Sequence, residues 1–280
     1  MKLSIVTINY NNAEGLKRTL ASVAEQSYRD IEHIIIDGGS TDGSVDFIKE
    51  YVSANPNHDP FFKHTIKWIS EKDNGIYNAM NKGIRKATGA YIQILNSGDL
   101  LAAPDVVEQM IAAIENAEYP ELLYGNMIKK DYAIGRIIGK SREVEYSLRQ
   151  YFSSTMNHDC CYFRRDLFET YGLYDENLKI VSDWKWFLQT IGLGRVRPVY
   201  VNIDVTVFDV SGISESNLEL RNGERRLVLE EVLPPAVLAD YDKYAFPMEQ
   251  YSRLKKFHLW GLVYFMERVL FKLNKWKILK

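Results

Sequence analysis

The first hundred residues alternate between apolar runs and amphipathic segments. The runs with the length of buried strands are Leu3–Asn9, Ile31–Ile36, Thr65–Ser70 and Ala90–Leu95. After the first run, Leu16, Leu20 and Val23 recur at helical spacing, and similar segments follow the other runs, the last opening at Pro104. Repeated strand–helix units of this kind predict a mainly parallel sheet flanked by helices, an α/β fold.

The pattern changes after Glu121. Leu122–Lys129 and Ala133–Lys140 are typical of an antiparallel pair, and further strands are expected at Cys160–Phe163 and Val196–Val210. A helix is expected just after Asp183, and the chain is helical in pattern from about Leu218. We therefore expect a mixed sheet in a domain at 1–215, followed by a helical C-terminal extension at 216–280.

Polar residues follow each of the first four strands. These residues are Asn9 and Tyr10, then Asp37, then Glu71 and Asp73, and finally Asn96 to Asp99. Because ligands bind beyond the carboxyl ends of parallel strands, the four groups should converge on one cleft.

Two of these groups contain glycine beside a carboxylate. The segment from Asp37 to Gly43, DGGSTDG, permits a tight turn, and Asp37 can accept a base N–H or a ribose hydroxyl. Asp99, at the end of Asn96-Ser97-Gly98-Asp99, can serve as a ligand of Mg²⁺ or Mn²⁺. For both segments the alternative is an ordinary turn. The G-x-G-x-x-G dinucleotide fingerprint is absent after the first strand.

Five ordered motifs carry a more specific resemblance. They are TINYNN, DGGSTDG, SEKDNGIYNAMNKGI, QILNSGD and VSDWKWFL, and the resemblance covers roughly residues 1–215. In this order they resemble family 2 glycosyltransferases with the Rossmann-like GT-A fold, of the bacterial cell-surface polysaccharide type. The resemblance implies an inverting transfer from a nucleotide-sugar, most often a UDP-sugar, to a glycan or lipid-linked acceptor.

The resemblance also implies roles for single residues. Thr7, Asn9, Tyr10, Asp37, Asp73 and Asn96 match positions on the nucleotide side. Asp99 matches the metal side, although the family's D-x-D motif is altered here to Asn96-Ser97-Gly98-Asp99. Asp183 matches the general base that takes the acceptor's proton, and Mn²⁺ or Mg²⁺ is the implied cofactor.

Several of these residues also have structural explanations. Without the family, Asp183 would be interpreted as a helix N-cap. His158 is a candidate contact of diphosphate, metal or acceptor, or a structural histidine. Trp184 and Trp186 could raise the basicity of Asp183 by partial desolvation, or could equally be a core anchor and a sugar-stacking surface, one each.

Charge is distributed unevenly along the chain. The net charge of -2 predicts no nucleic-acid partner, whereas residues 251–280 hold six Lys and two Arg against one Glu. We expect this aromatic and basic segment to lie on an anionic membrane surface, with packing on the domain or in a homodimer as alternatives. Without a signal-peptide pattern or a spanning apolar run, a cytoplasmic, membrane-peripheral location is expected.

Two competing functions remain at this stage. A non-catalytic scaffold or partner subunit with the same fold is kept open by the altered metal motif, but it has no need for Asp37, Asp99 and Asp183 together. A sugar-nucleotide pyrophosphorylase would require a glycine-rich basic loop after the first strand, where TINYNN stands instead.

Overall fold

The computed structural model describes residues 1–54, 64–143, 147–210, 217–243 and 266. Met1–Arg225 form one compact unit, and the chain from Arg226 on forms a second unit. The predicted domain boundary between 215 and 216 falls in the interval 211–216, outside the described residues, and stays a prediction. The same holds for the basic segment 251–280, of which only Met266 is described.

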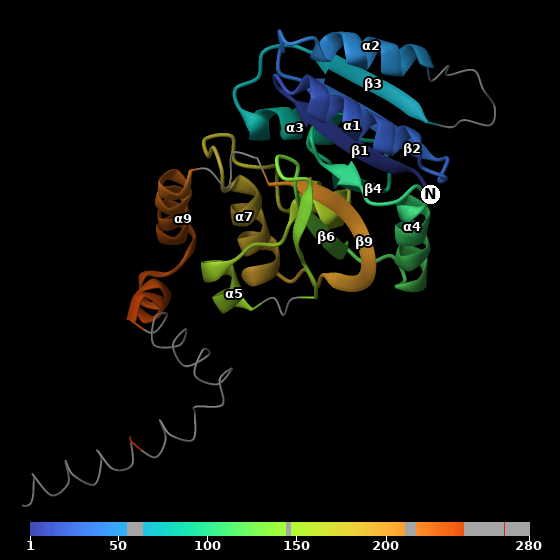
Figure 1. Ribbon diagram of the computed structural model, residues 1–280. Coiled ribbons are helices and arrows are strands. Elements are labelled where there is room, and N and C mark those ends of the chain that lie inside the picture. Colours follow the sequence, from blue (N-terminus) through green and yellow to red (C-terminus); the bar gives the residue numbers. More distant parts are fainter. Residues whose placement is uncertain (55–63, 144–146, 211–216, 244–265, 267–280) are drawn as a thin grey trace, which may run out of the picture. The chain divides into compact units, whose positions relative to one another are not determined.

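Four parallel strands form the first half of the sheet. β1 (Leu3–Asn9), β2 (Ile31–Asp37), β3 (Thr65–Ser70) and β4 (Tyr91–Ile94) lie in the order β3-β2-β1-β4 (Figure 1). Asn9 is paired with Asp37, and Asp37 with Ser70, so the three strands end level with one another. This confirms the predicted parallel half and its shared carboxyl edge.

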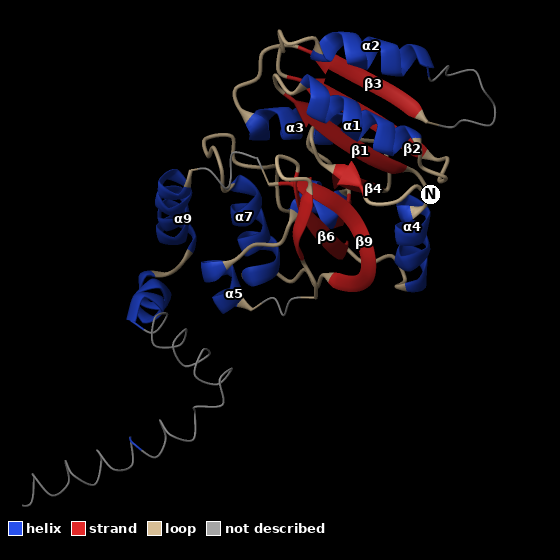
Figure 2. Ribbon diagram, viewed as in Figure 1, coloured by secondary structure: helices blue, strands red, loops and turns tan. Residues whose placement is uncertain are grey.

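Helices cover both faces of these strands because alternate strand residues point to opposite sides. α1 (Ala13–Ala24) and α2 (Ser44–Ala54) bury apolar residues against one face, where they share a core cluster with Ile35 of β2 (Figure 2). α3 (Ile76–Lys86) packs on the other face, where Gly83 lies directly against Val6 of β1. α4 (Val106–Asn116) contributes to the core cluster that contains β1 and the end of β9.

The second half of the sheet is mixed. Its strands are β8 (Cys161–Arg164), β6 (Leu122–Asp131), β9 (Val199–Asp209) and β5 (Leu100–Leu101), which continue the order after β4, with β7 (Arg136–Lys140) paired to β6. β8 is antiparallel to β4 and β6, whereas β9 runs parallel to β6. The predicted antiparallel pair is confirmed as β6 and β7.

Short helices connect and flank these strands. They are α5 (Leu148–Ser153), η1 (His158–Cys160), α6 (Asp166–Thr170), α7 (Ser182–Phe187) and η2 (Leu188–Gly192). The longer helix α9 (Leu218–Val232) follows them in the chain. Within the described residues, no helix is long and apolar enough to cross a membrane.

Candidate active site

The Asp37 carboxylate organises the end of β2. It is fully buried and accepts hydrogen bonds from the Asn9 amide (2.8 Å), the Ser70 hydroxyl (2.6 Å) and both the hydroxyl and the N–H of Ser40 (2.6 and 3.0 Å). Burial raises the pKa of Asp37, but the hydrogen bonds from Ser40, Ser70 and Asn9 prevail, so its pKa lies below the ordinary value. Asp37 thus ties the ends of β1, β2 and β3 together as an anion.

Tyr10, Gly38 and Asp73 lie side by side above this carboxylate. A Cβ built on Gly38 would lie 3.1 Å from the Tyr10 ring and 3.3 Å from Asp73 Oδ2. Tyr10 is 68% exposed, and Lys82 of α3 donates to Asp73 Oδ1 at 2.6 Å. The absence of a side chain on Gly38 leaves an aromatic face and a carboxylate next to one another at the edge of the sheet.

A second group of side chains surrounds Asp183. Its Oδ2 lies 3.1 Å from His158 Nδ1, and its Oδ1 accepts the Tyr77 hydroxyl at 2.9 Å. The other ring nitrogen of His158, Nε2, lies 3.1 Å from the amide of Asn96, which follows β4. Asn96, His158, Asp183 and Tyr77 therefore form one continuous hydrogen-bonded chain, although they are separated by up to about a hundred positions in sequence.

The contacts within this chain determine its charge state. Burial raises the pKa of Asp183, but the hydrogen bond and charge of His158 and the Tyr77 hydroxyl outweigh burial and lower it. Burial lowers the pKa of His158, but its hydrogen bond to Asp183 and the nearby carboxylates raise it. Asp183 is thus held as a carboxylate at neutral pH, and the expected increase in its basicity from the two tryptophans does not prevail.

Asp99 lies near this chain in a strongly acidic region. Its Oδ1 accepts the backbone N–H of Asp209 at 3.0 Å, and its side chain is almost fully buried. Burial and the negative charge of Asp159 raise the pKa of Asp99 well above its ordinary value. Arg18 of α1 pairs with Asp209 at 3.3 Å. Three aspartates from separate parts of the chain therefore gather beside the end of β4.

The residues around Asn96 and Asp99 suit a hard cation whose coordination is supplied largely by phosphate oxygens of a bound molecule. Among the described residues, no group of three or more His, Cys, Asp or Glu side chains is arranged to hold a metal ion. The Asn96 Oδ1 atom, however, is buried and has no hydrogen-bond partner in that part of the chain, and a cation beside Asp99 would offset the burial and the Asp159 charge that raise its pKa. Two oxygen donors with phosphate oxygens and water satisfy the coordination that Mg²⁺ requires.

Two of the predicted site residues are placed inside the protein. Thr7 is fully buried, and its hydroxyl lies 2.9 Å from His33 Nε2, so its side chain is not accessible to a nucleotide. A nucleotide contact through the backbone of Thr7 stays a prediction. Trp184 is 1% exposed and donates to the Tyr151 carbonyl, and Trp186 is 2% exposed. Neither indole offers the exposed face that stacking on a sugar requires, so both anchor the core.

Asp183 is the second residue of α7, whose N-cap is Val181. The N-cap interpretation of Asp183 is therefore wrong. Tyr77 and Asp159 belong to the site but were not singled out from the sequence. Tyr77 lies within the motif GIYNAMNKGI, through which the sequence could have identified it, whereas no local sequence pattern distinguishes Asp159.

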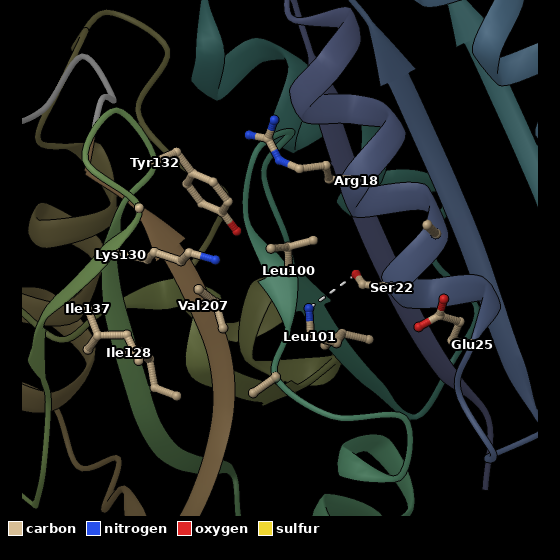
Figure 3. Close-up of a pocket in the computed structure, with 13 residues that line it drawn as sticks. Arg18, Ser22, Glu25, Leu100, Leu101, Ile128, Lys130, Tyr132, Ile137 and Val207 are labelled. Carbon is tan, nitrogen blue, oxygen red and sulfur yellow. Dashed lines mark hydrogen bonds between the residues drawn. The ribbon is translucent and has the colours of Figure 1, made fainter.

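Beyond Asp209 the surface is hollowed between α1, β5, β9 and the β6–β7 hairpin. The hollow has a volume of about 590 Å³, and Arg18, Lys130 and Tyr132 project into it above an apolar floor that includes Leu100 and Val207 (Figure 3). The guanidinium of Arg18 and the ammonium of Lys130 each lie 4.5 Å from the centre of the Tyr132 ring.

Solved structures with this fold are similar to the chain at low identity. TarS 1–349 of S. aureus in complex with UDP matches with a TM-score of 0.63 at 18% identity, covering 88% of this chain and 72% of that one. A longer TarS structure is covered to 41% of its length. A mannosyltransferase from Pyrobaculum calidifontis in complex with GDP-Man and Mn²⁺ matches with a TM-score of 0.55 at 19% identity, covering 75% and 57%. These likenesses show the GT-A fold.

Sequence comparisons identify the family. An uncharacterized glycosyltransferase of Mycobacterium tuberculosis is 32% identical over 217 residues, which are 75% of this chain and 76% of the relative. A PGL/p-HBAD biosynthesis glycosyltransferase of Mycobacterium bovis is 27% identical over 211 residues, 75% of this chain and 77% of the relative. The family model described as glycosyl transferase family 2 matches residues 4–172, more than half of the chain. The chain therefore belongs to glycosyl transferase family 2.

Proposed function

We propose that this enzyme transfers a sugar with inversion from a UDP-sugar to a glycan or lipid-linked acceptor in cell-surface polysaccharide synthesis. The observation that carries the proposal is the Asp183 carboxylate, held between His158 and Tyr77 and joined through Asn96 to the end of β4. TarS has been solved with UDP and with UDP-GlcNAc, which supports a UDP-sugar. A relative described as a PGL/p-HBAD biosynthesis glycosyltransferase supports transfer in a biosynthetic pathway. The acceptor in this proposal is reached at the cytoplasmic face of the membrane.

The nucleotide is bound at the ends of β1, β2 and β3. The exposed Tyr10 ring offers a stacking surface, and the Asp73 carboxylate beside Gly38 is placed to accept a base N–H or a ribose hydroxyl. Asp37 contributes by fixing Asn9 and the turn at Ser40, since its own oxygens are engaged by protein donors.

Asp183 acts as the general base. The acceptor hydroxyl gives its proton to the carboxylate as its oxygen bonds to the anomeric carbon, and the bond from that carbon to the diphosphate breaks on the opposite side. Each carboxylate oxygen has a second lone pair, so an acceptor hydroxyl can bind although His158 and Tyr77 are already bound. The same two contacts fix the orientation of the carboxylate before the acceptor arrives.

The leaving group is a nucleoside diphosphate with growing negative charge. Asp99 and Asn96 are the residues that would hold Mn²⁺ or Mg²⁺ together with the diphosphate oxygens, and the cation supplies the neutralisation of that charge. Because two side chains of the described residues contribute, we expect the ion to bind weakly without nucleotide and more tightly with it.

Transfer assays with a panel of UDP-sugars and Mn²⁺ test this proposal. A UDP-sugar is expected to be turned over, and proton NMR of the product formed from an α-linked donor is expected to show a β-linked sugar. Binding of UDP without turnover of any donor on lipid-linked acceptors would favour the scaffold function instead. A product that retains the donor's configuration would contradict the role of Asp183 as base.

A further inference from the structure

The hairpin between β6 and β7 exposes an unusual concentration of apolar surface. Ile134, Ile137 and Ile138 are 60%, 66% and 56% exposed, and they lie within five residues of one another. A single exposed isoleucine is ordinary, but three exposed isoleucines within five residues of one hairpin indicate a contact surface. The described part of the chain does not cover these three side chains.

The same hairpin is rich in positive charge. Residues 128–140 contain Lys129, Lys130, Arg136 and Lys140 against the single carboxylate of Asp131, a local charge of +3 in a chain whose net charge is -2. Asp131 accepts the N–H groups of Ala133 and Ile134 within the turn. Lys140 is paired with Asp204, Lys130 lies over the Tyr132 ring, and Arg136 is exposed at the start of β7.

The hairpin projects from the side of the sheet. β7 pairs with β6 and lies off the main path of strands, and the hollow of Figure 3 opens beside it, with Lys130 and Ile137 at its wall. All three isoleucines of the hairpin are therefore exposed to solvent, with Ile137 at the wall of the hollow.

We propose that the β6–β7 hairpin docks the protein on the surface of an anionic lipid bilayer. The isoleucines enter the boundary between headgroups and acyl chains, and the lysines and Arg136 lie among the anionic headgroups. A second copy of this chain is the less suitable occupant, because a two-fold contact through this surface would bring the same cations against one another. The proposal concerns a surface distinct from residues 251–280 and does not depend on the transferase activity.

Flotation of the full chain with phosphatidylcholine vesicles, with and without phosphatidylglycerol, tests the proposal. The variant Ile137→Thr/Ile138→Thr keeps β-branched side chains in the strand and is expected to lower the partition coefficient on the anionic vesicles about tenfold. Tyr119→Thr/Leu193→Thr, which alters side chains 53% and 44% exposed elsewhere, is the matched control and is expected to change it less than about twofold.

The charge contribution is measured separately. Lys130→Gln/Arg136→Gln is expected to weaken binding to the phosphatidylglycerol vesicles and to leave binding to phosphatidylcholine alone unchanged. UDP affinity is expected to be unchanged in the isoleucine variant, which shows that the fold is intact.

Three results would overturn the proposal. The first is an isoleucine variant that binds anionic vesicles as the unmodified chain does. The second is a full chain that binds no vesicles at all. The third is a dimer in analytical ultracentrifugation that the isoleucine substitutions convert to a monomer while vesicle binding is unchanged, which would assign the surface to a second copy. Failure of sugar transfer leaves all three readouts intact and bears only on the proposed function.

Discussion

Each oxygen of the Asp183 carboxylate has its own partner, and the two partners come from different elements that are far apart in sequence. Tyr77 lies on α3, in a motif close to Asp73, whereas His158 immediately precedes β8. The residue types of this site could be predicted from the sequence with the family resemblance. Their partners could not, because the bonds from His158 and Tyr77 to Asp183 span 25 and 106 positions and leave no local pattern.

The Tyr77 hydroxyl is expected to position the base. It lies 2.9 Å from Asp183 Oδ1 and 2.7 Å from the Ile180 carbonyl, in a buried setting. Tyr77→Phe removes a hydrogen bond to a charged group and is expected to lower kcat for transfer about tenfold or more, while the Kd for UDP stays within about twofold. An equal loss of UDP affinity would instead indicate a structural role, and titration calorimetry separates the two results.

Tyr10 is expected to act on binding alone. Because its ring is 68% exposed beside Gly38 and Asp73, its removal costs little stability. Tyr10→Ala is expected to weaken UDP binding about tenfold through lost stacking and to leave kcat at saturating donor nearly unchanged. Tyr119→Ala, which alters another exposed tyrosine, is the control. Unchanged UDP affinity in Tyr10→Ala would show that the uracil ring binds elsewhere.

At the scale of elements, the periodicity of apolar residues predicts the strands of the first half of the chain to within one residue at each end. β1 and β3 have the predicted bounds, β2 is one residue longer at its end, and β4 is one residue shorter at each end. β5 has only two residues and α5 only six, so neither is long enough to show a period, and both were missed. Trp186 of α7 is buried against the rings of Phe163 and Phe168, and the buried Trp184 donates to the Tyr151 carbonyl. These are tertiary contacts that the motif does not encode.

The packing of α3 on β1 depends on a glycine. A Cβ on Gly83 would collide with the side chain of Val6, whereas the helical Gly223 has nothing within 4 Å of that position. Gly83→Ala is expected to lower the free energy of unfolding by about 2 kcal/mol, since overpacking outweighs the gain in helix propensity. Gly223→Ala is expected to raise it by about 1 kcal/mol. Urea denaturation measures both, and stabilisation by both substitutions would contradict the close approach.

In the first unit, the carboxyl ends and the amino ends of the parallel strands hold buried carboxylates with different roles. The carboxyl edge carries the site, and the opposite edge carries Glu32, which is 1% exposed and accepts hydrogen bonds from Ser4, Lys67 and Thr88. Burial raises the pKa of Glu32, but these donors lower it to about 2 from 4.5. The chain thus places a stabilising anion far from the catalytic ones.

Because the pKa of Glu32 is depressed in the fold, its stabilisation is complete above pH 4.5 and is lost as the pH falls toward 2. Between pH 7 and pH 3 the loss from this group is expected to be about 2 kcal/mol. Glu32→Gln should therefore show a smaller drop in unfolding free energy over that range than the unmodified chain. Identical drops in urea denaturation would show that Glu32 is not the group responsible.

The central claim is that Asp183 takes the acceptor's proton at a rim where the nucleotide is bound by other residues. The most direct measurement compares Asp183→Asn with the unmodified enzyme in single-turnover transfer and in UDP binding. The substitution keeps the shape of the side chain and removes its basicity, so transfer is expected to fall at least about a hundredfold while UDP affinity stays within about threefold. Retained transfer, or loss of UDP binding in parallel with transfer, would contradict the claim.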